Sequence, residues 1–101
     1  MLLKTIATGS SGNCHALIAD TGEILLLDLG ENEKKIKKGI GWKISDVVGA
    51  IVTHKHADHS KSVNEFERMG VPVLKPYENE SDIGLKNISG FREQAFDLTT
   101  I

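Results

Sequence analysis

Apolar and polar positions divide the first part of the chain into short strand-like runs separated by turn formers. Apolar, partly alternating runs cover residues 2–8, 15–19 and 23–28. The first run leads into Gly9–Asn13, a cluster of glycine, serine and asparagine, and Asp20-Thr21-Gly22 separates the second run from the third. Both intervening segments are rich in residues that favour turns. We therefore expect three strands connected as a meander.

After Gly30 the apolar period changes to that of a helix. Asn32 can cap a helix that continues through Lys38, with apolar residues on one face and charged residues on the other. A short capped turn at residues 45–46 precedes Ala50–Thr53, a β-branched run typical of a strand that is buried on both faces. The pattern thus predicts a helix and then an interior strand.

The second half of the chain is partly regular. Apolar residues three apart predict an amphipathic helix over residues 60–69, ended by Gly70, and residues 72–74 resemble a short strand. Residues 78–82 are polar and suggest the start of a short helix, and residues 91–99 alternate as a strand does. The order of elements predicts a mixed α/β (α+β) class in which helices cover a sheet.

Length and charge limit the function classes. With 101 residues the chain has room for a single domain. The net charge is −2, so the whole-chain field does not attract nucleic acid. Binding to nucleic acid therefore needs a local patch or a metal ion.

The single cysteine and the short apolar runs indicate a compartment. Cys14 has no second cysteine with which to form an internal disulfide, which fits a reducing compartment, and we expect the cytoplasm. The longest apolar run, Ile24–Leu27, is too short to cross a bilayer, and the first residues do not have the pattern of a signal peptide. No membrane association is expected.

Metal-binding side chains cluster where the expected interior strand ends, in Thr53-His54-Lys55-His56-Ala57-Asp58-His59. His54 and His56 are two residues apart, so in an extended segment both imidazoles project to the same side and can reach one ion. Asp58 and His59 follow at a turn into a helix, which would direct them toward a second position nearby. The spacing suggests two metals.

Imidazole and carboxylate ligands suit zinc, with iron or manganese as alternatives. Two such ions lower the pKa of water and hold the oxygens of a phosphate or carbonyl group, so the implied reaction class is hydrolysis. The alternative interpretation is a solvated histidine-containing loop that binds no metal.

The motif resembles the HxHxDH signature of the metallo-beta-lactamase superfamily. Leu25–Gly30 resembles the preceding strand of that superfamily, which ends in an aspartate. Gly9–Cys14 resembles the glycine-serine loop of a bacterial and phage branch that includes DNA exonucleases. The resemblance covers residues 1–74 and implies the first βα half of an αββα sandwich.

The resemblance also implies a role for each site residue. His54 and His56 would bind the first metal, and Asp58 and His59 the second, with Asp58 also acting as the catalytic proton acceptor. Asp28 would orient the motif through hydrogen bonds, as carboxylates behind metal ligands commonly do. The alternative for Asp28 is an ordinary turn residue at the end of a strand.

A site of this family needs further ligands, namely a third histidine, a bridging aspartate and a last histidine. No histidine follows His59, and we do not assign Asp97 to the site. We therefore expect residues 1–101 to be a single partial domain that self-associates, with a complementary chain that supplies the second half as the alternative.

Three functions are compatible with the sequence. The favoured one is an N-terminal fragment of a metal-dependent hydrolase that cleaves phosphodiester bonds of nucleic acid. The others are a catalytically silent metal-binding module that dimerises, and one half of a split enzyme.

Overall fold

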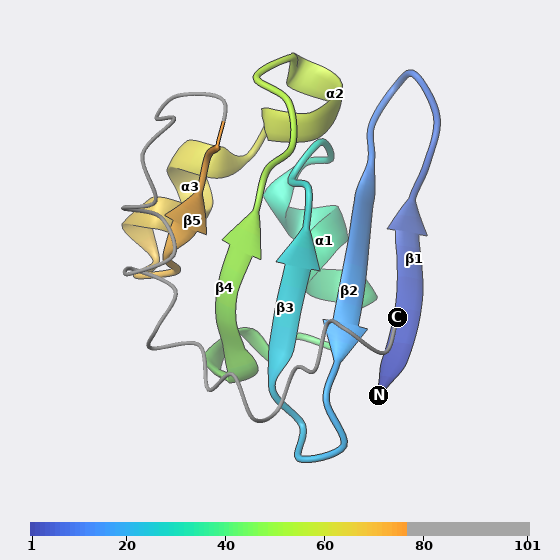
Figure 1. Ribbon diagram of the computed structural model, residues 1–101, viewed down its shortest axis with the longest axis vertical. Coiled ribbons are helices and arrows are strands. Elements are labelled where there is room, and N and C mark those ends of the chain that lie inside the picture. Colours follow the sequence, from blue (N-terminus) through green and yellow to red (C-terminus); the bar gives the residue numbers. More distant parts are fainter. Residues whose placement is uncertain (77–101) are drawn as a thin grey trace.

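The computed structural model describes residues 1–76, which form a sheet with helices packed on one face (Figure 1). The elements in chain order are β1 (Leu2–Ala7), β2 (Cys14–Ile18), β3 (Ile24–Leu27), α1 (Glu33–Gly39), the 3-10 helix η1 (Ile44–Asp46), β4 (Val47–Ile51), α2 (Ala57–Ser60), α3 (Val63–Arg68) and β5 (Val73–Leu74). The sequence predictions for residues 78–82, 91–99 and Asp97 lie outside the described residues.

The five strands are hydrogen-bonded in the order β1-β2-β3-β4-β5. The first three form the expected antiparallel meander, and β4 and β5 then add in parallel to β3. Because β1, β3, β4 and β5 run in one direction, their carboxyl ends lie at the same edge of the sheet (Figure 1). The segments that follow those strands therefore lie at this edge.

One face of the sheet packs against α1 and α3, and this interface is the main core. Strands, helices and the segments between them contribute to it through Cys14, Ala16, Ile24, Leu26, Leu29, Ile36, Ile40, Val47, Ala50, Val52, Val63, Phe66 and Val71. Ile36 and Phe66 are fully buried and carry the apolar faces of the two helices onto the sheet. The mixed α+β class expected from the pattern is confirmed.

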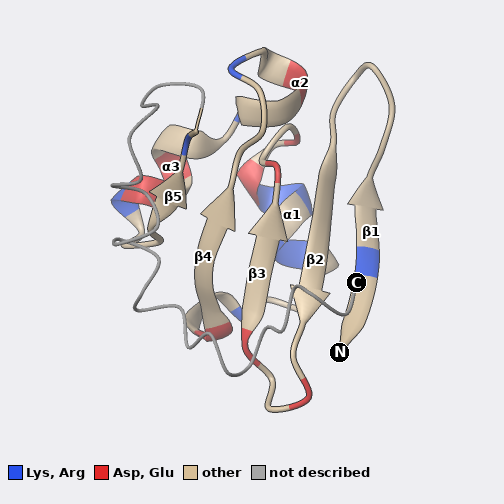
Figure 2. Ribbon diagram, viewed as in Figure 1, with Lys and Arg blue, Asp and Glu red and all other residues tan. Residues whose placement is uncertain are grey.

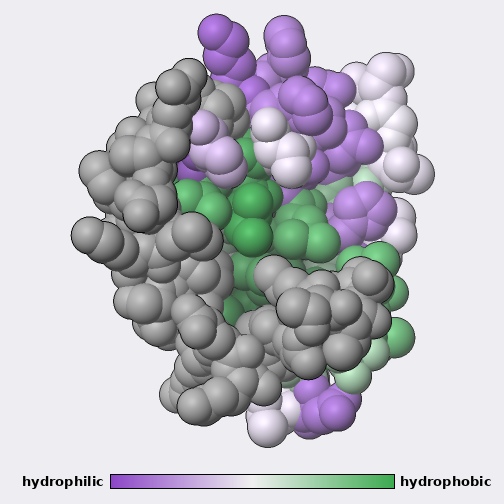
Figure 3. Space-filling view, viewed as in Figure 1, coloured by the Kyte–Doolittle hydropathy of each residue, from purple (hydrophilic) through white to green (hydrophobic). Residues whose placement is uncertain are grey.

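The opposite face of the sheet has a smaller apolar cluster. Leu17, Ala19 and Leu25 are buried there, and Leu27, Val48 and Ile51 pack around them half-buried. Figure 3 shows apolar surface on this face among the residues that the structure describes. The strands β2, β3 and β4 contain no charged residue, and the charges lie mainly on helices and in loops (Figure 2).

Local sequence signals explain the first helix. Asn32 caps α1 by accepting a hydrogen bond from Lys35 N over 2.8 Å, and Ile36 lies on the buried face, so the expected helix is confirmed. The interior strand begins earlier than predicted, at Val47 rather than Ala50, and ends at Ile51. Its last residue precedes the histidine motif, which leaves Thr53 in the segment after the strand.

The amphipathic helix predicted over residues 60–69 is present as α3 with Val63 and Phe66 on its buried face, but it begins at Val63 and not at Ser60. Two helices occupy this region, α2 before Lys61 and α3 after Ser62. Ser62 is buried, and both its main-chain N–H (2.9 Å) and its hydroxyl (3.2 Å) donate to the carbonyl of Leu29. The Ser62 main-chain N–H therefore makes no hydrogen bond within a helix. The helix is interrupted at this point, where the chain contacts the end of β3.

Candidate functional site

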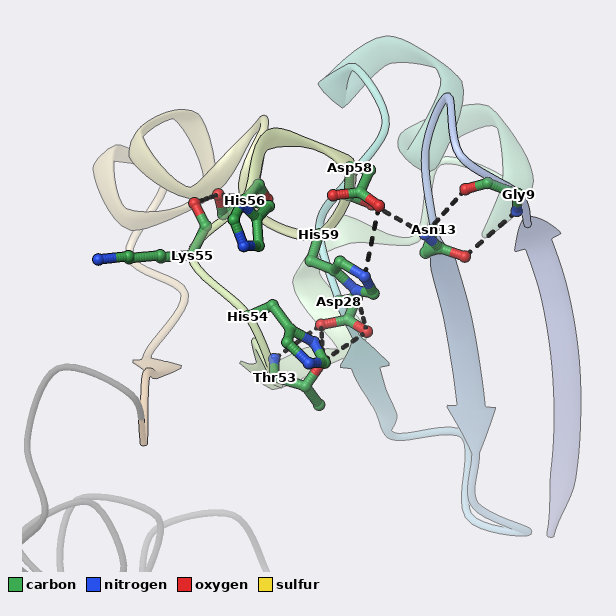
Figure 4. A network of polar contacts seen from close by, with 10 residues as sticks. Gly9, Asn13, Asp28, Thr53, His54, Lys55, His56, Asp58 and His59 are labelled. Carbon is green, nitrogen blue, oxygen red and sulfur yellow. Dashed lines mark hydrogen bonds and ion pairs between the residues drawn. The ribbon is translucent and has the colours of Figure 1, made fainter.

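Four segments meet at the carboxyl edge of the sheet and bring the motif residues together (Figure 4). Asp28 follows β3 directly, and His54 and His56 lie between β4 and α2. Asp58 and His59 lie inside α2, because this helix begins at Ala57 and not near Ser60 as expected. The fourth segment is the glycine-serine loop, residues 9–13, which connects β1 to β2.

Asp28 connects two of these segments through its carboxylate. It accepts hydrogen bonds from Thr53 N over 2.8 Å and from Thr53 Oγ1 over 3.0 and 3.1 Å. With its proton on Nδ1, His59 donates to the same carboxylate over 3.0 Å. Asp28 is buried, so these bonds are shielded from water and hold the segment after β4 against α2.

His54 is oriented indirectly by the same carboxylate. The hydroxyl of Thr53 donates its only proton to Asp28, and it lies 2.9 Å from His54 Nδ1. It can therefore only accept from His54, which requires the proton of that imidazole on Nδ1. In the neutral form of His54 and His59 with this tautomer, Nε2 carries the free lone pair.

The second nitrogen of His59 faces Asp58. Nε2 lies 3.5 Å from Asp58 Oδ2, and the ring centroids of His59 and His54 are 4.6 Å apart. A carboxylate behind one histidine nitrogen, with the other nitrogen directed outward, is the usual arrangement behind a metal-bound histidine. The donor set therefore fits a divalent metal in its chemistry.

His56 lies farther along the turn (Figure 4). Its imidazole is exposed, and its carbonyl accepts from His59 N at 2.9 Å and from Ser60 N at 3.0 Å. The Ser60 hydroxyl donates to the carbonyls of both Lys55 and His56 at 2.9 Å. These bonds define the turn into α2.

The candidate site is incomplete within residues 1–76. In that part of the chain no three side chains of histidine, cysteine, aspartate or glutamate converge as a metal site requires. The four predicted ligands do lie at one edge of the sheet.

Three contributors to this edge were not assigned a role from the sequence. Thr53 connects Asp28 to His54, and Asn13 bonds to the main chain of Asp58. Gly30 contacts the same carbonyl so closely that a Cβ at this position would lie 1.7 Å from Asp58 O. The glycine-rich segments were visible in the sequence, but the Asp58 carbonyl that they contact is 28 positions from Gly30 and 45 positions from Asn13.

Cys14 lies in the main core near this edge but faces no solvent. Burial, followed by the negative charges of Asp28 and Glu31, raises the pKa of its thiol to about 12. Cys14 packs in the core as a small apolar residue. Glu31 has a lowered pKa because the Asn32 N–H and the Lys35 ammonium bond to its carboxylate.

Among the helices of residues 1–76, none has the length and apolar character to cross a membrane.

Comparison with known proteins gives two matches. The family model of the metallo-beta-lactamase superfamily matches residues 7–98. The anti-Pycsar protein Apyc1 of Paenibacillus xerothermodurans is 33% identical over 69 residues, which cover 63% of this chain and 28% of that protein. The chain therefore matches less than a third of the length of this relative.

Proposed function

Because the chain belongs to the metallo-beta-lactamase superfamily, we propose that it is the N-terminal part of a metal-dependent hydrolase that cleaves phosphodiester bonds of nucleic acid. The observation that supports this most is the group of Asp28, His59 and Asp58, joined by contacts of 3.0 and 3.5 Å at the carboxyl edge of the sheet. His54 lies beside it, with its ring directed by Thr53.

In this proposal His54 and His56 bind a first divalent metal, and Asp58 and His59 bind a second. Zinc is favoured by the ligand types, with manganese or iron as alternatives. When bound, two such metals lower the pKa of water and neutralise charge on the phosphate. Superfamily membership supports divalent metal binding, because the superfamily generally binds such ions.

The side chains of this chain then have separate tasks. Asp28 holds Nδ1 of His59 directly and directs His54 through the Thr53 hydroxyl, which leaves both Nε2 nitrogens available. The Asp58 carboxylate lies 3.5 Å from His59 Nε2, and we assign to it the acceptance of a proton from the attacking water. These tasks require imidazole rings in fixed orientations, which the hydrogen bonds of the buried Asp28 maintain.

The rest of the site comes, in this proposal, from additional polypeptide. Residues 1–101 then form one partial domain, and the ligands that residues 1–76 lack are supplied by a second half. The 28% coverage of the relative supports this division. A cytoplasmic location is part of the same proposal and is supported by the buried free thiol of Cys14.

Self-association is the favoured way in which the isolated chain contacts a partner. β1 is an edge strand, and it exposes Leu2 (60%) and Leu3 (54%). Exposed apolar edge strands pair readily with a second copy, and Lys4 is the single charge on this strand. A complementary chain at this edge is the alternative outcome.

The first experiment combines metal binding with turnover in the full-length protein. Native mass spectrometry with zinc or manganese should show two metals per site, and a chromogenic phosphodiester should be hydrolysed. Changing both His54 and His56 to Ala should remove the first metal and at least about 100-fold of the activity. The control is His15→Ala, which alters a histidine of β2 that bonds to Thr5 instead.

The other two functions predict different results in this experiment. A silent metal-binding module gives metal-loaded dimers without hydrolysis, and a split enzyme gains hydrolysis only after a complementary chain is added. A full-length protein that binds no metal would exclude the proposed hydrolase. Comparing nucleic acid with thioester and lactam substrates tests the choice of a phosphodiester.

The similarity to Apyc1 favours a second candidate function. That relative is named an anti-Pycsar protein, and we extend to this chain a role in opposing Pycsar. Expression of the full-length protein in cells with active Pycsar should reduce its effect, and the double His54, His56 variant should not. If that variant reduces the effect of Pycsar as much as the wild type does, the role in opposing Pycsar does not depend on the proposed metal site.

A further inference from the structure

Asn13 lies outside the proposed ligand set and bonds to it through its side chain (Figure 4). Its Nδ2 donates to Gly9 O over 2.9 Å and to Asp58 O over 3.2 Å. Its Oδ1 accepts from Gly9 N over 3.2 Å. One half-buried amide therefore closes the glycine-serine loop and connects it to α2.

The main chain of Asn13 makes the same connection more tightly. Asn13 N donates to Asp58 O over 2.7 Å, so this one carbonyl receives two hydrogen bonds from Asn13. Asn13 O accepts from Gly30 N over 2.8 Å. The close approach of Gly30 to Asp58 O completes a contact among the loop, the end of β3 and α2.

The Asp58 carbonyl controls the directions of two proposed ligands. It belongs to the peptide that joins Asp58 to His59, so rotation of this peptide turns both side chains. In a continuous helix its donor would be the N–H of residue 62. That N–H instead bonds to Leu29 O at 2.9 Å, and Asn13 takes its place.

We infer that Asn13 is a positioning residue for the Asp58–His59 half of the site. It acts through the Asp58 carbonyl, and it makes the glycine-serine loop a structural part of the metal centre. This inference rests on the proposed function for the identity of the metal ligands. It specifies that the second metal depends on Asn13, whereas the metal at His54 and His56 does not.

The test is Asn13→Asp in the full-length protein, with zinc binding followed by calorimetry and native mass spectrometry. The change keeps the main-chain bonds and the side-chain size. It replaces the Nδ2 donor with an oxygen that faces the carbonyls of Gly9 and Asp58. Affinity for one of the two zinc ions should fall by about tenfold or more, and the other should be unchanged.

Two further variants keep this test interpretable. Asn64→Asp makes the same charge change at an exposed position of α3 and should leave both zinc affinities unchanged. Asn13→Ala removes the side-chain donor without adding a charge, so it replaces Asn13→Asp if the latter does not fold. Equal weakening of both zinc sites, or no change at either, would overturn the inference.

A metal-free measurement separates this inference from the proposed function. Nitrogen NMR of the imidazole rings should show a shift at His59 in the Asn13 variant and none at His56. An unchanged His59 ring would refute the positioning role. If the wild-type protein binds no zinc but His59 shifts, the proposed hydrolase fails and the role of Asn13 is retained.

Discussion

Asp28 has a backbone φ of 66°, a left-handed conformation that aspartate and asparagine adopt more readily than most residues. This conformation directs the carboxylate toward Thr53 and His59 immediately after β3 ends. The hydrogen bonds made there fit the orienting task expected for Asp28 better than that of an ordinary turn residue.

Asp28→Asn tests the carboxylate while keeping the backbone conformation. An amide oxygen in place of Oδ1 can still accept from Thr53 N and Thr53 Oγ1, but the amide nitrogen in place of Oδ2 cannot accept from His59, so the free energy of unfolding should fall by about 2 kcal/mol. Urea denaturation measures this change, and Asp46→Asn in η1 is the exposed control. A loss equal to that of the control would show that the buried carboxylate contributes nothing specific.

Cys14 should be unreactive and should make stability depend on alkaline pH. Its folded pKa is raised to about 12, so the folded protein keeps the thiol proton where the unfolded chain has lost it. Stability from this group is therefore complete below about pH 9 and falls by about 1 kcal/mol per pH unit above it. A thiol reagent at pH 8 should modify Cys14 only in urea, and Cys14→Ala should flatten the alkaline dependence.

At the scale of elements, the start of α1 follows a local rule. The carboxamide of Asn32 accepts from Lys35 N, one of the N–H groups that have no partner within a helix. Asn32→Ala should lower the free energy of unfolding by about 1 kcal/mol in urea denaturation. Asn32→Asp retains the acceptor oxygen and should lose less, and an equal loss would exclude capping as the cause.

The contact between α2, the end of β3 and the glycine-serine loop requires a residue without a side chain at position 30. A Cβ on Gly30 would lie 1.7 Å from Asp58 O and 2.7 Å from Asn13 N, both of which are main-chain atoms. Gly30→Ala should therefore cost about 3 kcal/mol in denaturation experiments and weaken metal binding. Gly22→Ala is the control, because its Cβ meets no atom within 4 Å and only its φ of 101° is unfavourable.

At the scale of the whole molecule, β1 is the outer strand of the sheet at which a second chain can pair. Leu3→Lys places a second charge on β1 and should convert dimers or larger species of the 101-residue chain into monomers. Light scattering coupled to gel filtration measures the mass. Met69→Lys after α3 is the control and should not change it. A wild-type monomer would contradict the proposed self-association.

The sequence alone determined the superfamily and most of the elements. Alternating apolar runs and turn residues were sufficient for β1, β2 and β3, and a capping asparagine was sufficient for α1, because these signals act between residues close in sequence. The motif at residues 53–59 was also local, and the family match over residues 7–98 confirms the resemblance drawn from it. The ligand assignments of the individual residues stay predictions.

The tertiary structure alone decided how the motif is held. The break between α2 and α3, the Thr53 link from Asp28 to His54, and the bonds of Asn13 to Asp58 join residues that are 25 to 45 positions apart or depend on such contacts. Sequence periodicity carries no information about such pairs, because it reports only which face of an element is apolar. Hydrogen bonds between loops are set by the packing of the sheet that brings the loops to one edge, and so they follow from the fold.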